Sequence, residues 1–318
     1  MPEHPTSTQS LVTVGLENLS PQHFEVLQQA LWMILSTDLA TETFAQVVDG
    51  RPTRDVYQDY IYEFRKSFHD NIHPSDAALK AVEFCRQNLD LGSLQISATI
   101  IQAFQNATPG SREFHLRLIE ILAVLCHGIA VHLYQAYDGG FHKPEPPDPI
   151  VWPSELLQPN MPPPPPPPPL KALPAELFHH SYDSWQQYPN GVADIVGYWA
   201  EYRLFGGVVL FDRGEAGHEC NDIYIHPVGG YMIFQLSEAQ VHAYIRFLQG
   251  GPEPPGGIRF KAEEYARRVD ENYAMDMNIY RDRYERIISQ RRARCVIRGE
   301  DLPGYAQAMD DWARRTGN

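Results

Sequence analysis

Cysteine is scarce in this sequence, and its four residues lie far apart along the chain: Cys85, Cys126, Cys220 and Cys295. No CxxC pair occurs, and the spacing does not resemble the dense disulfide framework of a small secreted domain. Cys85 and Cys126 lie in apolar helical patterns, where cysteine behaves as a small hydrophobic residue. We therefore expect free thiols in a reducing compartment, and a cytoplasmic or nuclear protein.

Basic residues are also few, with 26 Lys and Arg against 40 Asp and Glu, for a net charge of −14. General nucleic-acid binding needs a basic footprint, so this composition argues against it. The last 61 residues, 258–318, nevertheless hold 13 of the 26 basic residues. Arg291, Arg292 and Arg294 are the centre of this basic patch. We favour a role in balancing the acidic body of the same protein, with an acidic protein partner, nucleic acid or anionic lipid as alternatives.

Several familiar motifs are missing. There is no Walker, Rossmann or G-x-S-x-G pattern, so the sequence predicts no cofactor. The opening residues MPEHPTSTQS lack a basic region followed by an apolar core, so we expect no secretory signal there. Residues 118–134 are apolar but include Glu120, His127 and His132, and they are short for a membrane span. A buried helix and no membrane contact is the better interpretation.

The first half of the chain reads as helices. We expect a disordered segment over 1–18 and a bundle of five helices over 19–142, joined by short connections. Ser20-Pro21, Pro74-Ser75-Asp76 and Pro109-Gly110-Ser111 are typical helix starts. The histidines His127 and His132 on the last and most apolar helix are expected to face neighbouring polar groups rather than a metal.

Proline is concentrated in one segment, because 15 of the 27 prolines lie within residues 143–174. Eight are consecutive, from Pro162 to Pro169, and Leu170 closes the run. Such a run forms polyproline II, at about 3.1 Å per residue, so it is stiff and about 25 Å long. A spacer is the plainer interpretation. The alternative is a docking site for a proline-recognising domain, with Pro162, Pro165, Pro169 and Leu170 as contact residues.

The second half, 175–318, is expected to mix helices with a small antiparallel sheet. Helical spacing favours a helix over 192–202, and short β-branched runs predict strands over 208–211, 223–226 and 231–234. Ser237-Glu238 is expected to start a further helix. Residues 259–292 contain neither proline nor glycine, and their spacing predicts one long helix.

Part of this half resembles a known group. The stretch YPNGVADIVGYWAEYRLFGGVVLFDRG is similar to a segment of uncharacterised proteins of filamentous fungi, over about residues 178–236. No activity is attached to that group. The resemblance implies only a fungal intracellular protein.

Two sets of residues are candidates for chemistry. The carboxylates Glu201, Asp212 and Asp194 lie in the most aromatic part of the chain, around Trp199, where burial raises the pKa of a carboxyl group towards the range useful for acid–base catalysis. An enzyme would use Glu201 and Asp212 together with a histidine, His226. The plainer interpretation is that the carboxylates pair with Arg203 and Arg213.

His218, Cys220 and His226 form the other set, with an H-x-C-x5-H spacing. A tetrahedral zinc site needs four ligands and this pattern offers three, so a polar loop between strands is favoured over a metal site.

Taken together, the sequence predicts a mainly α protein of the α+β type. We expect an N-terminal helical bundle, a proline-rich linker, and C-terminal helices with a small antiparallel β element. The leading functional hypothesis is a non-enzymatic interaction or scaffold protein with a polyproline docking tract. The alternative is an enzyme that uses carboxylates and a histidine in an aromatic pocket around Trp199.

Overall fold

The computed structural model describes residues 12–57, 70–144, 174–254 and 256–282, together with the single positions 307 and 314. Within these ranges the fold is mainly helical with a small antiparallel sheet, as predicted. The first half contains, in order, β1 (Thr13–Gly15), α1 (Pro21–Leu35), α2 (Asp38–Asp49), α3 (Arg54–Tyr57), α4 (Asp76–Gln87), β2 (Gln95–Ser97), α5 (Ala98–Asn106) and α6 (Arg112–Ala136). The second half contains α7 (Val192–Phe205), β3 (Val208–Asp212), β4 (Ile223–His226), β5 (Met232–Gln235), α8 (Glu238–Leu248), β6 (Arg268–Asp270), α9 (Glu271–Ala274) and β7 (Ile279–Tyr280).

Side-chain caps fix where the long helices begin. Ser20, Ser75 and Ser111 each accept a hydrogen bond from a backbone N–H in the first turn of α1, α4 and α6. Ser237 caps α8 in a complete capping box with Gln240. These caps satisfy N–H groups that have no partner inside the helix. The helix starts predicted at all four serines are confirmed.

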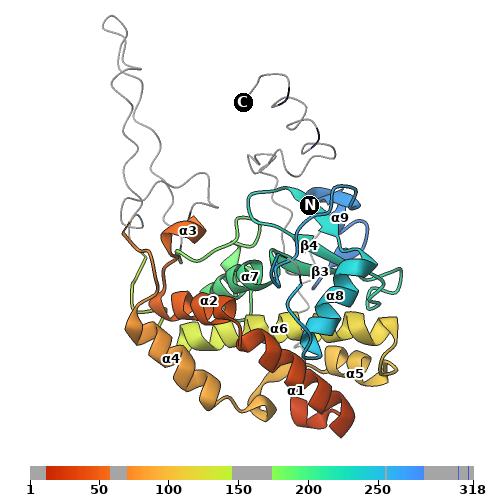
Figure 1. Cartoon of the computed structure of the whole chain (residues 1–318), viewed down its shortest axis with the longest axis horizontal. Helices are drawn as coiled ribbons and strands as arrows, with labels where there is room; N and C mark the ends of the chain where they lie inside the picture. The colour runs from red at the N-terminus through yellow and green to blue at the C-terminus, as the bar shows by residue number, and fades with distance from the viewer. Residues whose placement is uncertain are drawn as a thin grey trace, which may run out of the picture.

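Helix α6 is the central helix of the described structure. Figure 1 shows it crossing the width of the body, with α1 and α4 on one side and the sheet on the other. It is long and apolar enough to cross a membrane, yet most of its residues are buried against neighbouring elements of the described chain. A core helix passes the same test of length and composition. The predicted buried helix is therefore confirmed.

The larger sheet has the order β6-β5-β4-β3-β7, and every neighbouring pair is antiparallel. Alternate residues of β3 enter different apolar clusters. Val209 and Phe211 pack into the main core, which also contains residues of α6 and α7. Val208 and Leu210 pack into a second cluster with Tyr182 and other residues. Because side chains alternate along a strand, both faces of this sheet are buried.

The two halves of the chain share that main core. It includes residues of α1, α2, α5 and α6 together with residues of α7, β3 and α8. Trp199 on α7 is completely buried there. Helix α7 ends at Gly206, whose φ of 87° is the left-handed conformation that suits glycine. The stretch around Trp199 thus joins the helices to the sheet.

Two expectations about helices are wrong. The long helix predicted for 259–292 is absent over 259–282, where β6, α9 and β7 lie instead. The reason is tertiary, because β5 and β3 take β6 and β7 as antiparallel partners and this pairing overrides the local helical pattern. The first predicted helix is two helices, because Thr37 caps a new start at α2.

Candidate functional site

A group of four charged residues lies where α6, α7 and the end of β7 meet. We call His127, Asp194, Glu201 and Arg281 the charged quartet. Gly197 on α7 makes the approach of His127 possible, because a Cβ at this position would lie 2.6 Å from the His127 ring. No ordinary side chain tolerates such a contact, so this glycine is required by the close packing of α6 on α7.

Both ring nitrogens of His127 face carboxylates. Nδ1 lies 2.8 Å from Oε1 of Glu201, and Nε2 lies 3.0 Å from Oδ1 of Asp194. A histidine that donates from both nitrogens is the charged imidazolium. Burial alone would lower the pKa of His127, but the hydrogen bonds to Asp194 and Glu201 outweigh it, so the pKa is raised. The two carboxylates favour the positively charged ring, against the opposing charge of Arg281, whose NH2 atom lies 3.3 Å from Nδ1.

Arg281 completes the charged quartet. Its NH1 and NH2 atoms form ion pairs with the two carboxylate oxygens of Glu201, at 2.5 and 2.6 Å. Asp194 accepts hydrogen bonds from the backbone and side chain of Asn190, at 2.8 and 3.0 Å. Although burial would raise the pKa of Asp194, its bonds to His127 and Asn190 hold the pKa below the usual range. When His127 is protonated, the charges of the four side chains balance.

The charged quartet offers a substrate little access. A general base needs an accessible lone pair within reach of substrate, but both nitrogens of His127 already face carboxylates. Little of the group meets solvent, since the side chain of Glu201 is fully buried and that of His127 is 12% exposed. The charged quartet joins α6, α7 and the β7 end, and its chemistry is that of a buried ion-pair network. The expected polar contact of His127 is confirmed.

A second buried group surrounds His226 on β4. Its Nδ1 lies 3.2 Å from the Tyr182 hydroxyl, and its Nε2 lies 3.2 Å from Oε2 of Glu271. Ser181 donates to the same glutamate oxygen at 2.7 Å. Burial would raise the pKa of Glu271, but the hydrogen bond to His226 and its charge dominate and lower the pKa to about 2. Glu271 is thus held ionised in the folded protein.

His180 lies close to this second group and is kept neutral. Burial, followed by the charge on His226, lowers the pKa of His180 to about 4. Its ring stacks on His179, with centroids 4.9 Å apart. A stacked neutral imidazole behaves here as a packing group.

The candidate catalytic residues are not assembled into one site. Asp212 ends β3 and accepts the backbone N–H of Gly214 at 2.9 Å, so it stabilises a turn. His226 pairs with Val208, at the opposite end of β3. Glu201 belongs to the charged quartet. Each side chain therefore serves a separate local interaction.

The expected pairing of buried carboxylates with arginine is confirmed for Glu201, but its partner is Arg281 and neither Arg203 nor Arg213. Arg213 instead pairs with Glu120 of α6, at 2.6 Å. Arg213 also donates to the backbone oxygen of Arg281 at 2.7 Å. This bond helps to fix the position of Arg281 beside Glu201. No local pattern in the sequence identifies Arg281, because its side-chain partners Glu201 and His127 lie 80 and 154 residues away.

The candidate metal ligands His218, Cys220 and His226 also lie in different environments. His218 is exposed in a loop, whereas Cys220 and His226 are buried. Among the residues that the structure describes, no group of three or more His, Cys, Asp or Glu side chains has a geometry that could hold a metal ion. Cys220 instead lies beside the Glu120 and Arg117 pair, and burial raises its pKa far above the usual value. A buried, protonated thiol is inert.

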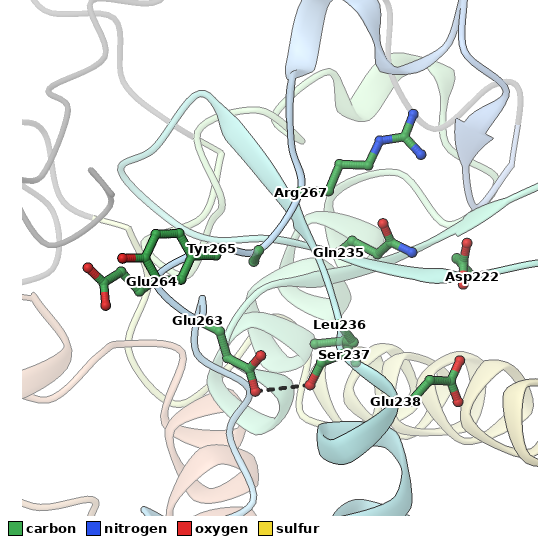
Figure 2. Close-up of a pocket in the computed structure, with 10 residues that line it drawn as sticks. Asp222, Gln235, Leu236, Ser237, Glu238, Glu263, Glu264, Tyr265 and Arg267 are labelled. Carbon is green, nitrogen blue, oxygen red and sulfur yellow. Dashed lines mark hydrogen bonds between the residues drawn. The ribbon is translucent and has the colours of Figure 1, made fainter. Parts of the chain in front are cut away.

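The proposed docking residues Pro162, Pro165, Pro169 and Leu170 lie outside the described residues, as do Arg291, Arg292 and Arg294. Two hollows on the surface of the described part are large enough to consider as binding sites. One lies between α8 and the segment that leads into β6, and Figure 2 shows the side chains that line it. Its carboxylates are already engaged: Glu263 accepts from the Ser237 hydroxyl at 2.9 Å, and Arg112 bridges Asp222 and Glu238.

The other hollow is an apolar groove between α4 and α6, with a volume of about 690 Å³. Its walls include Phe84 and Leu89 from the α4 side and Val124, Leu133 and Tyr137 from α6 and its end. Phe84 is 67% exposed, which is unusual for so large an apolar side chain. The groove is thus an open apolar surface, in contrast with the closed charged groups.

Comparison with known proteins gives no assignment. No family model matches the chain, and no match was found among curated proteins or solved structures. The resemblance to fungal proteins stays a prediction.

Proposed function

We propose that this chain is a non-enzymatic interaction protein of the cytosol or nucleus. Its binding element is the run Pro162–Pro169 with Leu170, and its partner is a proline-recognising domain. The observation that carries the proposal is that the two flanks of this segment are anchored at the same end of α6. The alternative, an enzyme built on Glu201, Asp212 and His226, has less support because these residues serve separate structural contacts.

The flank that precedes the segment is held against α2. The backbone N–H groups of Phe141 and His142 donate to the carbonyl oxygens of Val48 and Asp49, at 2.9 and 2.7 Å. Just beyond them, Lys143 lies near the end of α6, because a Cβ at Gly139 would lie 3.7 Å from its Nζ atom. The chain therefore leaves the body from a fixed point.

The flank that follows the segment is fixed as well. Ala175 and Leu177 are 1% and 0% exposed and belong to the main core. Burial and then the charge of Glu176 raise the pKa of Tyr134, which places that carboxylate near the last turn of α6. The same Tyr134 hydroxyl would lie 3.5 Å from a Cβ at Gly139. Both flanks thus lie near Tyr134, at the end of α6.

A preformed polyproline II run suits this role. It loses little conformational entropy on binding, so it docks into shallow aromatic grooves at low cost. Repetition offers several equivalent registers, which raises the apparent affinity without new contacts. The Arg291, Arg292 and Arg294 patch is proposed as a secondary contact for an acidic protein partner. The three described cysteines are free, in keeping with an intracellular setting.

Calorimetric titration of a profilin-type or EVH1-type domain tests the proposal. We expect the 160–171 peptide to bind with roughly micromolar affinity, about 8 kcal/mol. Any single Pro→Ala change should leave the affinity nearly unchanged because the register can shift, and three remaining prolines should not suffice. The matched control is a peptide of equal length with glycine and serine in place of the eight prolines. No binding of the proline peptide at millimolar concentration would overturn the proposal.

A further inference from the structure

The apolar groove between α4 and α6 has the chemistry that a polyproline ligand needs. Of the residues that line it, only Asp90 is a charged Asp, Glu, Lys or Arg. Two aromatic rings, Phe84 and Tyr137, stand among its aliphatic walls. Proline-rich ligands are uncharged and apolar, and the domains that bind them use aromatic-lined grooves. In a chain with a net charge of −14, an almost uncharged groove selects an uncharged occupant.

Polar donors also line the groove. A proline run has no backbone N–H but keeps every carbonyl oxygen as an acceptor. A matching surface must therefore offer side-chain donors. Gln95, His132 and the Tyr137 hydroxyl supply such groups around the apolar floor. Asn88 keeps one amide hydrogen beyond its bond to the Phe84 carbonyl oxygen. These side-chain donors suit a ligand whose backbone can accept hydrogen bonds but cannot donate them.

The lengths agree. The α6 residues that line the groove run from Val124 to Tyr137, which at 1.5 Å per residue is about 20 Å. Eight prolines in polyproline II span about 25 Å. Pro169 and Pro174 are five residue steps apart, which reach about 17 Å when extended. This exceeds the width of a helix, about 10 Å, so the end of the run can reach the Tyr137 end of the groove.

We propose that the run Pro162–Leu170 docks in the α4/α6 groove of its own chain and is thereby withheld from its partner. This inference rests on the proposed function, because it describes how the same binding element is regulated. The connection from Pro144 to Pro162 adds 18 residues, about 60 Å of reach, so it does not restrict docking. A partner binds only the undocked fraction, and its apparent affinity falls by that fraction.

Cys85 provides the test, because it lines the groove and is half-buried, whereas Cys126 and Cys220 are buried in the core. The full chain is treated with a thiol-alkylating reagent at fixed pH, and the rate at each cysteine is followed by peptide mass spectrometry. If the run covers the groove in about four-fifths of molecules, replacing its eight prolines with glycine and serine raises the Cys85 rate about fivefold. The rates at Cys126 and Cys220 should stay low in both proteins, which reports that the fold is intact.

Two variants sharpen this result. In F84A the groove loses an aromatic wall, so replacing the prolines should then change the Cys85 rate less than twofold. The matched control is Y273A, which removes another exposed aromatic ring outside the groove and should retain the fivefold effect.

An equal Cys85 rate with and without the prolines would overturn the inference. Protection that grows with protein concentration would also overturn it, because it would indicate a run from a second copy. The readout needs no partner domain, so its failure is distinct from a failure of partner binding, which would overturn the proposed function itself.

Discussion

Two neighbouring residues of α6 lie in opposite kinds of environment. His127 faces α7 and is enclosed by Asp194 and Glu201. Gly128 faces outward and lines the apolar groove. On the first side every charge has an opposite charge beside it, and the ring is fixed by its contacts. On the second side apolar surface remains open. The closed side contributes to stability, and the open side is the surface that we propose for binding.

Removing Glu201 should have the largest effect on stability. E201A leaves His127 and Arg281 buried without their shared anion, and breaking a buried pair in this way typically costs about 3–5 kcal/mol. We expect a loss of this size in the free energy of unfolding, measured with urea. The control is E238A, which removes a half-exposed carboxylate paired with Arg112 and should cost less than about 1 kcal/mol. Equal losses in the two variants would contradict the structural role of the charged quartet.

The pH dependence of stability tests whether His180, beside the second buried group, is neutral in the folded protein. The pKa of His180 is about 4 in the folded protein, whereas an unfolded histidine has a pKa of about 6.5. Below pH 6.5 the unfolded chain binds a proton that the folded protein does not, so stability is lost as pH falls from about 6.5 to about 4. His127 acts in the opposite sense, because its pKa is raised and its stabilisation is complete below pH 6.5.

Removing the titrating ring in H180F should therefore reduce the loss of stability between pH 6.5 and pH 4 by about 2–3 kcal/mol. Urea unfolding at several pH values measures this slope. An unchanged slope in H180F would mean that His180 titrates normally and is not held neutral by its surroundings.

Two helical glycines compare the closed and the open sides directly. In G197A the new methyl group meets the His127 ring, and we expect a loss of about 1–3 kcal/mol. In G128A a Cβ meets nothing within 4 Å, so the gain in helix propensity should stabilise the protein by about 0.5–1 kcal/mol. Thermal unfolding should thus shift in opposite directions. A shift in the same direction would show that α6 does not separate the two environments.

The smallest effect is expected at the groove wall. Phe84 is 67% exposed, so F84A removes little buried area and should change the free energy of unfolding by less than about 0.5 kcal/mol. A loss above about 2 kcal/mol would show that Phe84 is a core residue and that the groove is not open.

Local features of the sequence predicted much of the fold. The serine caps at Ser20, Ser75 and Ser237 fixed helix starts because capping depends on residues three positions apart. The β-branched runs at β3 and β4 predicted strands for a similarly local reason. What failed depends on distant partners, since β6 and β7 form only because β5 and β3 offer free edges.

For the candidate site, too, the sequence predicted the local features and missed those that depend on distant partners. The expected polar environment of His127 and the arginine pairing of Glu201 follow from the cost of burying unpaired charge. The identity of the partner, Arg281, does not follow from the sequence, because α6, α7 and β7 meet only in the folded chain. The groove was missed as well, since Phe84 and Tyr137 belong to separate helical patterns.

Partner binding by three full-length proteins gives the most direct test of the account. They are the wild type, D194N, which removes one charge of the charged quartet with little change of shape, and the variant with glycine and serine in place of Pro162–Pro169. Each is titrated calorimetrically against one proline-recognising domain. We expect D194N to bind within about twofold of the wild type and the proline variant not to bind, because the proposed function assigns binding to the proline run and only a structural role to the charged quartet. Binding that survives in the proline variant and is lost in folded D194N would contradict the account.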